Sequence, residues 1–148
     1  PTINTANVVV FDTTETSNGV SLGTPASRLV VDQSGLYQID INAQIEVVGN
    51  NSGIMYMWLV KDGTPVPHSM RRQGIQGTVP GSSFSYNIAV SLEAGSNIEI
   101  GYASSRLNVY FDASAATAFG PSTAAVLIGV TQIQLYFAID FIMLHNNI

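Results

Sequence analysis

The sequence contains no cysteine, which excludes a disulfide framework and any thiolate metal site in this chain. Charge is also scarce: Asp, Glu, Lys and Arg make up 10% of the 148 residues, against about 25% in an average soluble domain. The 10 acidic residues outnumber the 5 basic ones, and the net charge of −5 argues against nucleic acid as a partner. There is no apolar run of membrane-spanning length and no basic segment followed by an apolar one at the start, so we expect neither a transmembrane helix nor a secretory signal.

What the sequence does contain is apolar and neutral polar side chains. Apolar residues make up 46% of the chain, and Ser, Thr, Asn and Gln account for 44 residues. This length is typical of one domain with its own core, so we expect a single domain over residues 1–148. The composition fits a β domain with a Ser- and Thr-rich exterior, or a subunit that hides much of its surface against other copies. Because charged residues are depleted at the centre of protein interfaces, we favour the second interpretation.

The hydrophobic pattern alternates with a period of two, most clearly over residues 37–47. Tyr37, Ile39 and Ile41 begin the apolar face, while Gln38 and Asp40 begin the polar one. This alternation predicts an antiparallel strand with one buried face. Further strands are expected at residues 7–12, 28–32, 55–61, 84–92, 97–102, 108–112, 125–131 and 133–141. Helix signals are nearly absent, and residues 113–118 are interpreted as a loop, so the sequence predicts an all-β antiparallel sandwich of two sheets.

The two ends differ from the rest of the chain. Residues 1–7 are polar and without periodicity, which predicts an N-terminal arm. Residues 132–148 are very apolar for a terminal segment and predict a C-terminal strand or extension. This extension could be the last strand of the same sandwich, or it could add to a neighbouring subunit.

Several segments resemble one known superfamily. Phe11, Leu22, Gly35 and Tyr37 match its N-terminal signature in type and spacing, residues 58–66 resemble its strand-turn element, and residues 90–98 resemble its Leu-x-x-Gly-Asp-x-Val corner. Ser17 stands in place of an Asn or Asp, Ser96 in place of the Asp, and Leu29, Ile39 and Ile41 in place of aromatic residues. Over about residues 8–131 the chain therefore resembles the C1q/TNF-like jelly-roll superfamily.

This resemblance implies a two-sheet jelly roll that assembles as a compact homotrimer. It does not imply complement or cytokine activity, since a fold does not fix a function. The chain has no Gly-X-Y triplets of a collagen-like stem. A compact, cysteine-free and charge-poor form resembles most the C1q-like domains of bacteriophage virions, which serve as capsid decoration or as fibre heads.

Catalytic and metal-binding patterns are weak. The two histidines, His68 and His145, are far apart, and no spacing of His, Cys or carboxylates resembles a zinc site. There is no Gly-x-Ser-x-Gly nucleophile motif and no phosphate-binding glycine loop. We therefore expect no enzyme activity and no cofactor, while a calcium site built from several separate loops stays open.

Candidate contact residues are aromatic or basic. Those expected to lie in the core or in a trimer interface are Tyr56, Trp58, Phe84, Tyr86, Tyr110 and Phe111. Arg71 and Arg72, in the loop-rich stretch 65–80, could bind an acidic partner surface, because Arg binds carboxylates bidentately. Together with Tyr136, Phe137 and Phe141, they are the candidates for contacts with a capsid or another partner.

Two function classes follow. The first is a non-enzymatic structural protein of a phage virion, assembled in the host cytoplasm, whose trimers decorate or stabilise the capsid by contacts with the major capsid protein or other virion proteins. The alternative is a trimeric receptor- or glycan-binding head of a phage fibre or tail, with the loops at 50–53, 65–80 and 113–121 as binding sites. A secreted C1q-like protein is a third interpretation, and it would need a secretory signal.

Overall fold

The computed structural model describes residues 3–15, 17–49, 52–77 and 82–135, which form strands, turns and loops and include no helix. Accordingly, no helix that could cross a membrane is found in this part of the chain. The strands are β1 (Asn7–Val8), β2 (Val20–Leu22), β3 (Leu29–Val31), β4 (Gly35–Val47), β5 (Ser52–Lys61), β6 (Thr64–Pro65), β7 (Arg71–Gln76), β8 (Ser82–Leu92), β9 (Asn97–Ser104), β10 (Val109–Phe111) and β11 (Val126–Leu135).

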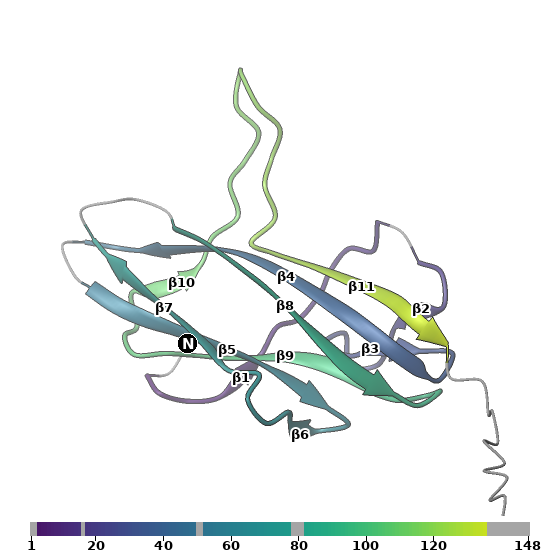
Figure 1. Cartoon of the computed structure of the whole chain (residues 1–148). Coiled ribbons are helices and arrows are strands. Elements are labelled where there is room, and N and C mark those ends of the chain that lie inside the picture. The colour runs from purple at the N-terminus through teal and green to yellow at the C-terminus, as the bar shows by residue number, and fades with distance from the viewer. Residues whose placement is uncertain (1–2, 16, 50–51, 78–81, 136–148) are drawn as a thin grey trace, which may run out of the picture.

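The strands form two antiparallel sheets that lie face to face (Figure 1). In the first sheet β9 and β5 pair with each other at the centre. The other edge of β9 pairs with β1 and β3, and the other edge of β5 pairs with β7 and β6. In the second sheet β4 is central, with β8 along one edge and β11 and β10 in succession along the other. The predicted all-β sandwich of two antiparallel sheets is confirmed.

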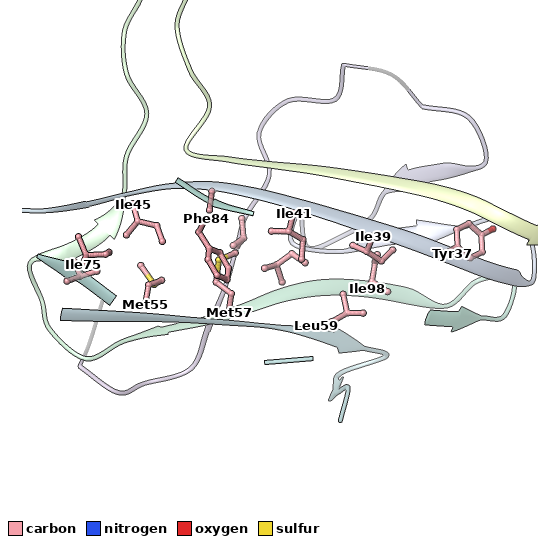
Figure 2. Packing of buried hydrophobic residues seen from close by; sticks show 14 of the residues in the cluster. Tyr37, Ile39, Ile41, Ile45, Met55, Met57, Leu59, Ile75, Phe84 and Ile98 are labelled. Carbon is pink, nitrogen blue, oxygen red and sulfur yellow. The ribbon is translucent and has the colours of Figure 1, made fainter. Parts of the chain in front are cut away.

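The core lies between the two sheets (Figure 2). On the second sheet it consists of the predicted apolar face of β4, in which Tyr37, Ala43, Val47 and the three isoleucines between them are all buried. Met55, Met57 and Leu59 of β5 and Ile98 and Ile100 of β9 meet this face from the first sheet. Burial of each such side chain stabilises the fold by roughly 1.5–3 kcal/mol, so the packing of β4 against β5 and β9 accounts for much of the stability.

The structure corrects the sequence interpretation at several edges. Residues 65–80 were expected to be loop-rich, but Arg71–Gln76 form β7, which pairs with β5 from Ser52 to Met57. The strands β2 and β6 were also not predicted. β2 has three residues and β6 two, and Ile75 is the one buried apolar side chain of β7. Backbone pairing with a neighbour, which leaves no hydrophobic pattern, is what forms them.

Two of the predicted strands differ most from the observed ones. Residues 133–135, where the strand expected over 133–141 would begin, instead continue β11 across a bulge between Gln132 and Gln134. The remainder of that prediction, residues 136–141, lies outside the described residues. The strand expected over 7–12 is reduced to Asn7–Val8, after which the Val9 N–H donates to Ile100 O at 2.9 Å and the Phe11 N–H to Ala26 O at 2.9 Å. Residues 113–118 are not helical, as predicted.

The described part of the N-terminal arm lies against β9. The Asn4 N–H donates to the carbonyl of Ser104 at 2.8 Å, and Ile3 forms a parallel bridge with the same residue. This places residues 3–8 along the edge of the first sheet, next to the groove described below.

Candidate interaction surfaces

The groups able to do chemistry are dispersed over the described part of the chain. No three of its His, Asp and Glu residues lie close enough to hold a metal ion. Several carboxylates instead accept hydrogen bonds that fix the fold: Glu99 from the Ser27 hydroxyl at 2.5 Å, Asp62 from the Asn97 N–H at 2.8 Å, and Glu93 from the Ser34 hydroxyl at 2.9 Å. His68 is an exposed turn residue with a φ of 61°, and His145 lies outside the described residues.

A large hollow follows the open side of the sandwich. One part has a volume of about 740 Å³ and the adjoining part about 190 Å³, and the two share Phe11, Thr13, Glu15, Val126 and Leu127 as lining residues. We call this groove the seam. It is bounded by residues 8–15 and β2 on the side of the first sheet, and by β11 and the residues before it on the side of the second sheet.

The seam is open because the two sheets do not join there. β11 pairs with β4 along one edge, and its other edge pairs with no strand of the described chain. The inward side chains of β11, which are Val126, Ile128 and Val130, pack against the core but stay half-buried. Large apolar side chains therefore reach solvent along the seam; Val8, Val10, Leu22 and Leu127 are between 37% and 69% exposed.

The outer face of the first sheet carries a second apolar surface, around Trp58. Trp58 and Tyr56 are half-buried on the face that points away from the core, and Val60 beside them is buried. The indole lies over Gly101, its partner on β9, in the space that a side chain at that position would fill. Since Glu99 on the same face is 8% exposed and bonded to Ser27, its carboxylate adds little free charge to this surface.

The other aromatic candidates divide between the core and the surface. Phe84 is buried between the sheets, and Tyr86 and Phe111 pack against the same core. Phe111 meets Tyr102 edge-on, with ring centroids 4.9 Å apart, at the floor of the seam. Tyr110 lies on the other side of the second sheet, opposite Glu46. Desolvation, together with the carboxylates of Glu46 and Asp112, raises the pKa of Tyr110.

The two arginines lie on opposite sides of β7. The Arg71 guanidinium carbon is 5.7 Å from the centre of the Tyr86 ring, and its Nη1 donates to the carbonyls of His68 and Met70 at 3.0 Å each. Arg72 is exposed and paired opposite Tyr56, toward the outer face. Tyr136, Phe137 and Phe141 lie outside the described residues. A contact of either arginine with a partner stays a prediction.

No protein-family model matches this sequence, and no curated protein matches it.

The sequence did not predict the seam. It did predict a loop in the hairpin beside the seam, with residues 113–121 as a binding site of the alternative function, but it did not single out Phe119. The seam is formed by Val8, Val10, Leu22 and Leu127, which come from three distant segments and show no shared motif. Phe119, in the hairpin between β10 and β11, is 94% exposed. The one signal was local: Phe119 is the single bulky side chain in an uncharged run from 113 to 125, directly before Gly120 and Pro121.

Proposed function

We propose that this chain is a non-enzymatic structural protein of a bacteriophage virion, which assembles as a homotrimer and decorates or stabilises the capsid. In this proposal its fold is a jelly roll of the C1q/TNF type, and it joins the particle in the host cytoplasm. The copies associate by burying apolar surface against one another. The major capsid protein or other virion proteins are their further partners.

The observation that carries the proposal is the seam. A single copy leaves large apolar side chains of Val8, Val10 and Leu127 in water, beside an edge strand with no partner in the described chain. The seam also contains polar side chains, among them Asp12 and Glu15, but exposed apolar side chains gathered along one groove are typical of surfaces that another protein covers. With 10% charged residues, contacts between copies can form without desolvating many ions. The resemblance to trimeric virion domains supports three as the copy number.

Mass measurement and sedimentation test the proposal. Light scattering on the purified protein should give three times the 15.7 kDa of one chain, constant over a wide concentration range. The trimer should also co-sediment with capsids assembled without it and raise the temperature at which they break. A stable monomer would contradict the homotrimer, and a trimer that ignores capsids but binds cells would contradict the capsid role.

The alternative, a receptor- or glycan-binding head, is favoured by one specific hollow. It has a volume of about 530 Å³ at the end of β5 and β7, and residues 52–53 of the predicted binding loop line it. Ser52, Gln76, Ser105 and Arg106 supply polar groups to it. Hydroxyl, amide and guanidinium groups on one site suit a sugar. Binding to a glycan array that is lost in Arg106→Ala, with no affinity for capsids, would decide for this alternative.

A further inference from the structure

The segment between β10 and β11 stands away from both sheets as a projecting hairpin over residues 112–125 (Figure 1). Its two limbs bond to each other: the Thr117 N–H donates to Gly120 O at 2.8 Å, and the Thr123 N–H to Ser114 O at 2.9 Å. The Ser114 N–H also donates to the Thr123 hydroxyl at 3.2 Å. Because these bonds already shape the hairpin, a partner that binds it need not supply the whole entropy of ordering it.

The composition of the projecting hairpin is that of a contact element. From 113 to 125 it has no charged residue, and apart from Phe119 and Pro121 every side chain is Ala, Ser, Thr or absent. Phe119 near its tip is 94% exposed, more than any other large apolar residue described. A scattered exposed apolar residue needs no explanation. An aromatic ring held in water at the end of a narrow hairpin is different, because the ring and residues 113–125 bring no ion that would lose its water on binding.

The seam offers a groove of suitable size and chemistry. Its larger part, about 740 Å³, falls within the range of about 300–1,000 Å³ typical of sites that hold a small ligand. Val10 and Leu127 stand at its sides, and the rings of Phe11, Tyr102 and Phe111 line it. An inserted phenyl ring would therefore meet both aliphatic side chains and aromatic rings.

The base and the tip of the hairpin lie in different places relative to the seam of their own chain. Ala113 and residues 122–125, at the base of the hairpin, line the seam of their own chain, while the tip projects away from the sheets. We infer that Phe119 at the tip of one projecting hairpin inserts into the seam of the next copy, beside Val10 and Leu127. Tip and seam are different surfaces, so the contact is head-to-tail and closes into a ring when the rotation between copies permits it. This inference rests on the proposed homotrimer.

Cysteine pairing tests the contact directly, since the chain has no cysteine of its own. Two differently tagged copies of the full chain are co-expressed, one with Phe119→Cys and the other with Val10→Cys. Mild oxidation should link the two tags into one disulfide-bonded pair. The matched control replaces Val10→Cys with Thr64→Cys, an exposed position on β6 at the opposite edge of the first sheet, and should give no link to Phe119→Cys.

The other results are distinguishable. A trimer that forms no Phe119–Val10 link overturns the hairpin contact and leaves the homotrimer standing. Disulfide pairs between two Phe119→Cys chains alone would show that the tips meet one another, and a link from Phe119→Cys only to a capsid protein would show a different partner; either result overturns the inference. A monomeric wild type overturns the homotrimer and the hairpin contact with it.

A second measurement does not depend on oxidation. Phe119→Ser changes a side chain that is 94% exposed, so one copy should fold as before. Association of the copies should weaken by about 10–100-fold, as expected for a buried aromatic anchor. Ala118→Ser is the matched control, because it adds a hydroxyl to the neighbouring exposed residue and removes no bulk. Equal dissociation of the two variants on dilution overturns the contact.

Discussion

Trp58 on β5 and Gly101 on β9 are directly opposite each other, and the indole occupies the space above the glycine. A Cβ built on Gly101 would lie 2.4 Å from Nε1 and Cε2 of the indole. No real Cβ tolerates such a distance, so the pair fixes the identity of residue 101 as long as Trp58 keeps its position. Gly101→Ala should therefore lower the free energy of unfolding by about 1–3 kcal/mol, the usual range for overpacking.

Fluorescence and urea denaturation check this prediction together. Trp58 is the single tryptophan, so the displaced indole should change the emission of the folded protein while the urea midpoint falls. Gly74→Ala is the matched control: Gly74 is also in a strand of the first sheet, but a Cβ there meets nothing within 4 Å. If both variants lose the same stability, steric contact with Trp58 is not the cause.

The Ser69 hydroxyl bonds to the backbone of β5 between the parts of that strand that pair with β7 and β6. Its replacement gives a second prediction. Ser69 is fully buried, its hydroxyl accepts from the Leu59 N–H at 3.0 Å, and it donates to Val66 O at 2.7 Å. Leu59 lies between the part of β5 that pairs with β7 and the part that pairs with β6. Ser69→Ala leaves the Leu59 N–H buried without this acceptor, and the free energy of unfolding should fall by about 1–3 kcal/mol.

Hydrogen exchange gives the local readout for Ser69. In Ser69→Ala the Leu59 amide should exchange faster than its neighbours on β5, and the urea midpoint should drop. Ser85→Ala, at an exposed position on β8, provides a control for the loss of a hydroxyl. A Leu59 amide that stays as protected as in the wild type would contradict the assigned role.

How much of the fold the sequence predicts depends on which strands carry side-chain patterns. β4 is predicted almost to the residue, because one face of it is buried by the opposite sheet and the alternation is therefore complete. β7 is not, because it is held at an edge by backbone bonds to β5 and only Ile75 is buried. Residues 71–76 were therefore interpreted as part of the loop-rich stretch 65–80.

The candidate surfaces show the same limit. Trp58 and Tyr56 are found from sequence because they are aromatic residues on one face of a strand whose other face is also apolar, which indicates that both faces are covered. Val8 and Leu127 are unremarkable by themselves, and only the arrangement of two sheets places them on opposite sides of one groove. A property that arises from distant segments leaves no local signal, and neither does the absence of a strand on the free edge of β11.

Tyr86 makes the stability of the fold sensitive to alkaline pH. Burial raises the pKa of Tyr86 from the usual 10.0 to about 12, although the nearby Arg71 guanidinium acts to lower it. Between these two pH values the unfolded chain releases a proton that the folded chain retains, so stability falls as the pH rises. The contribution of Tyr86 to the free energy of unfolding is complete below about pH 10 and is lost as the pH approaches about 12.

Tyr86→Phe should remove this part of the pH dependence. The difference in urea midpoint between variant and wild type should grow in favour of the variant from pH 8 to pH 11.5. At pH 8 the variant should be at least as stable, because the Tyr86 hydroxyl is buried with no hydrogen-bond partner among the described residues. Tyr56→Phe, which removes a hydroxyl outside the inter-sheet core, is the control. The same dependence of the urea midpoint on pH in the two variants would show that Tyr86 is not the cause.

Leu127 and Ile133 form a matched pair on β11 for testing where copies meet. They are 50% and 51% exposed, but Leu127 lines the seam and Ile133 does not. An aspartate at either position should change the stability of one copy by only about 0.5 kcal/mol. In Leu127→Asp, however, the carboxylate would be buried without a partner when a neighbour covers the seam. Association of the copies should then weaken by about 100-fold or more, whereas Ile133→Asp should leave it unchanged.

Both variants add one negative charge to a chain of net charge −5, so general repulsion between copies is the same for both. Light scattering over a dilution series measures the difference, and equal masses for the two variants at every concentration would exclude the seam as the contact surface.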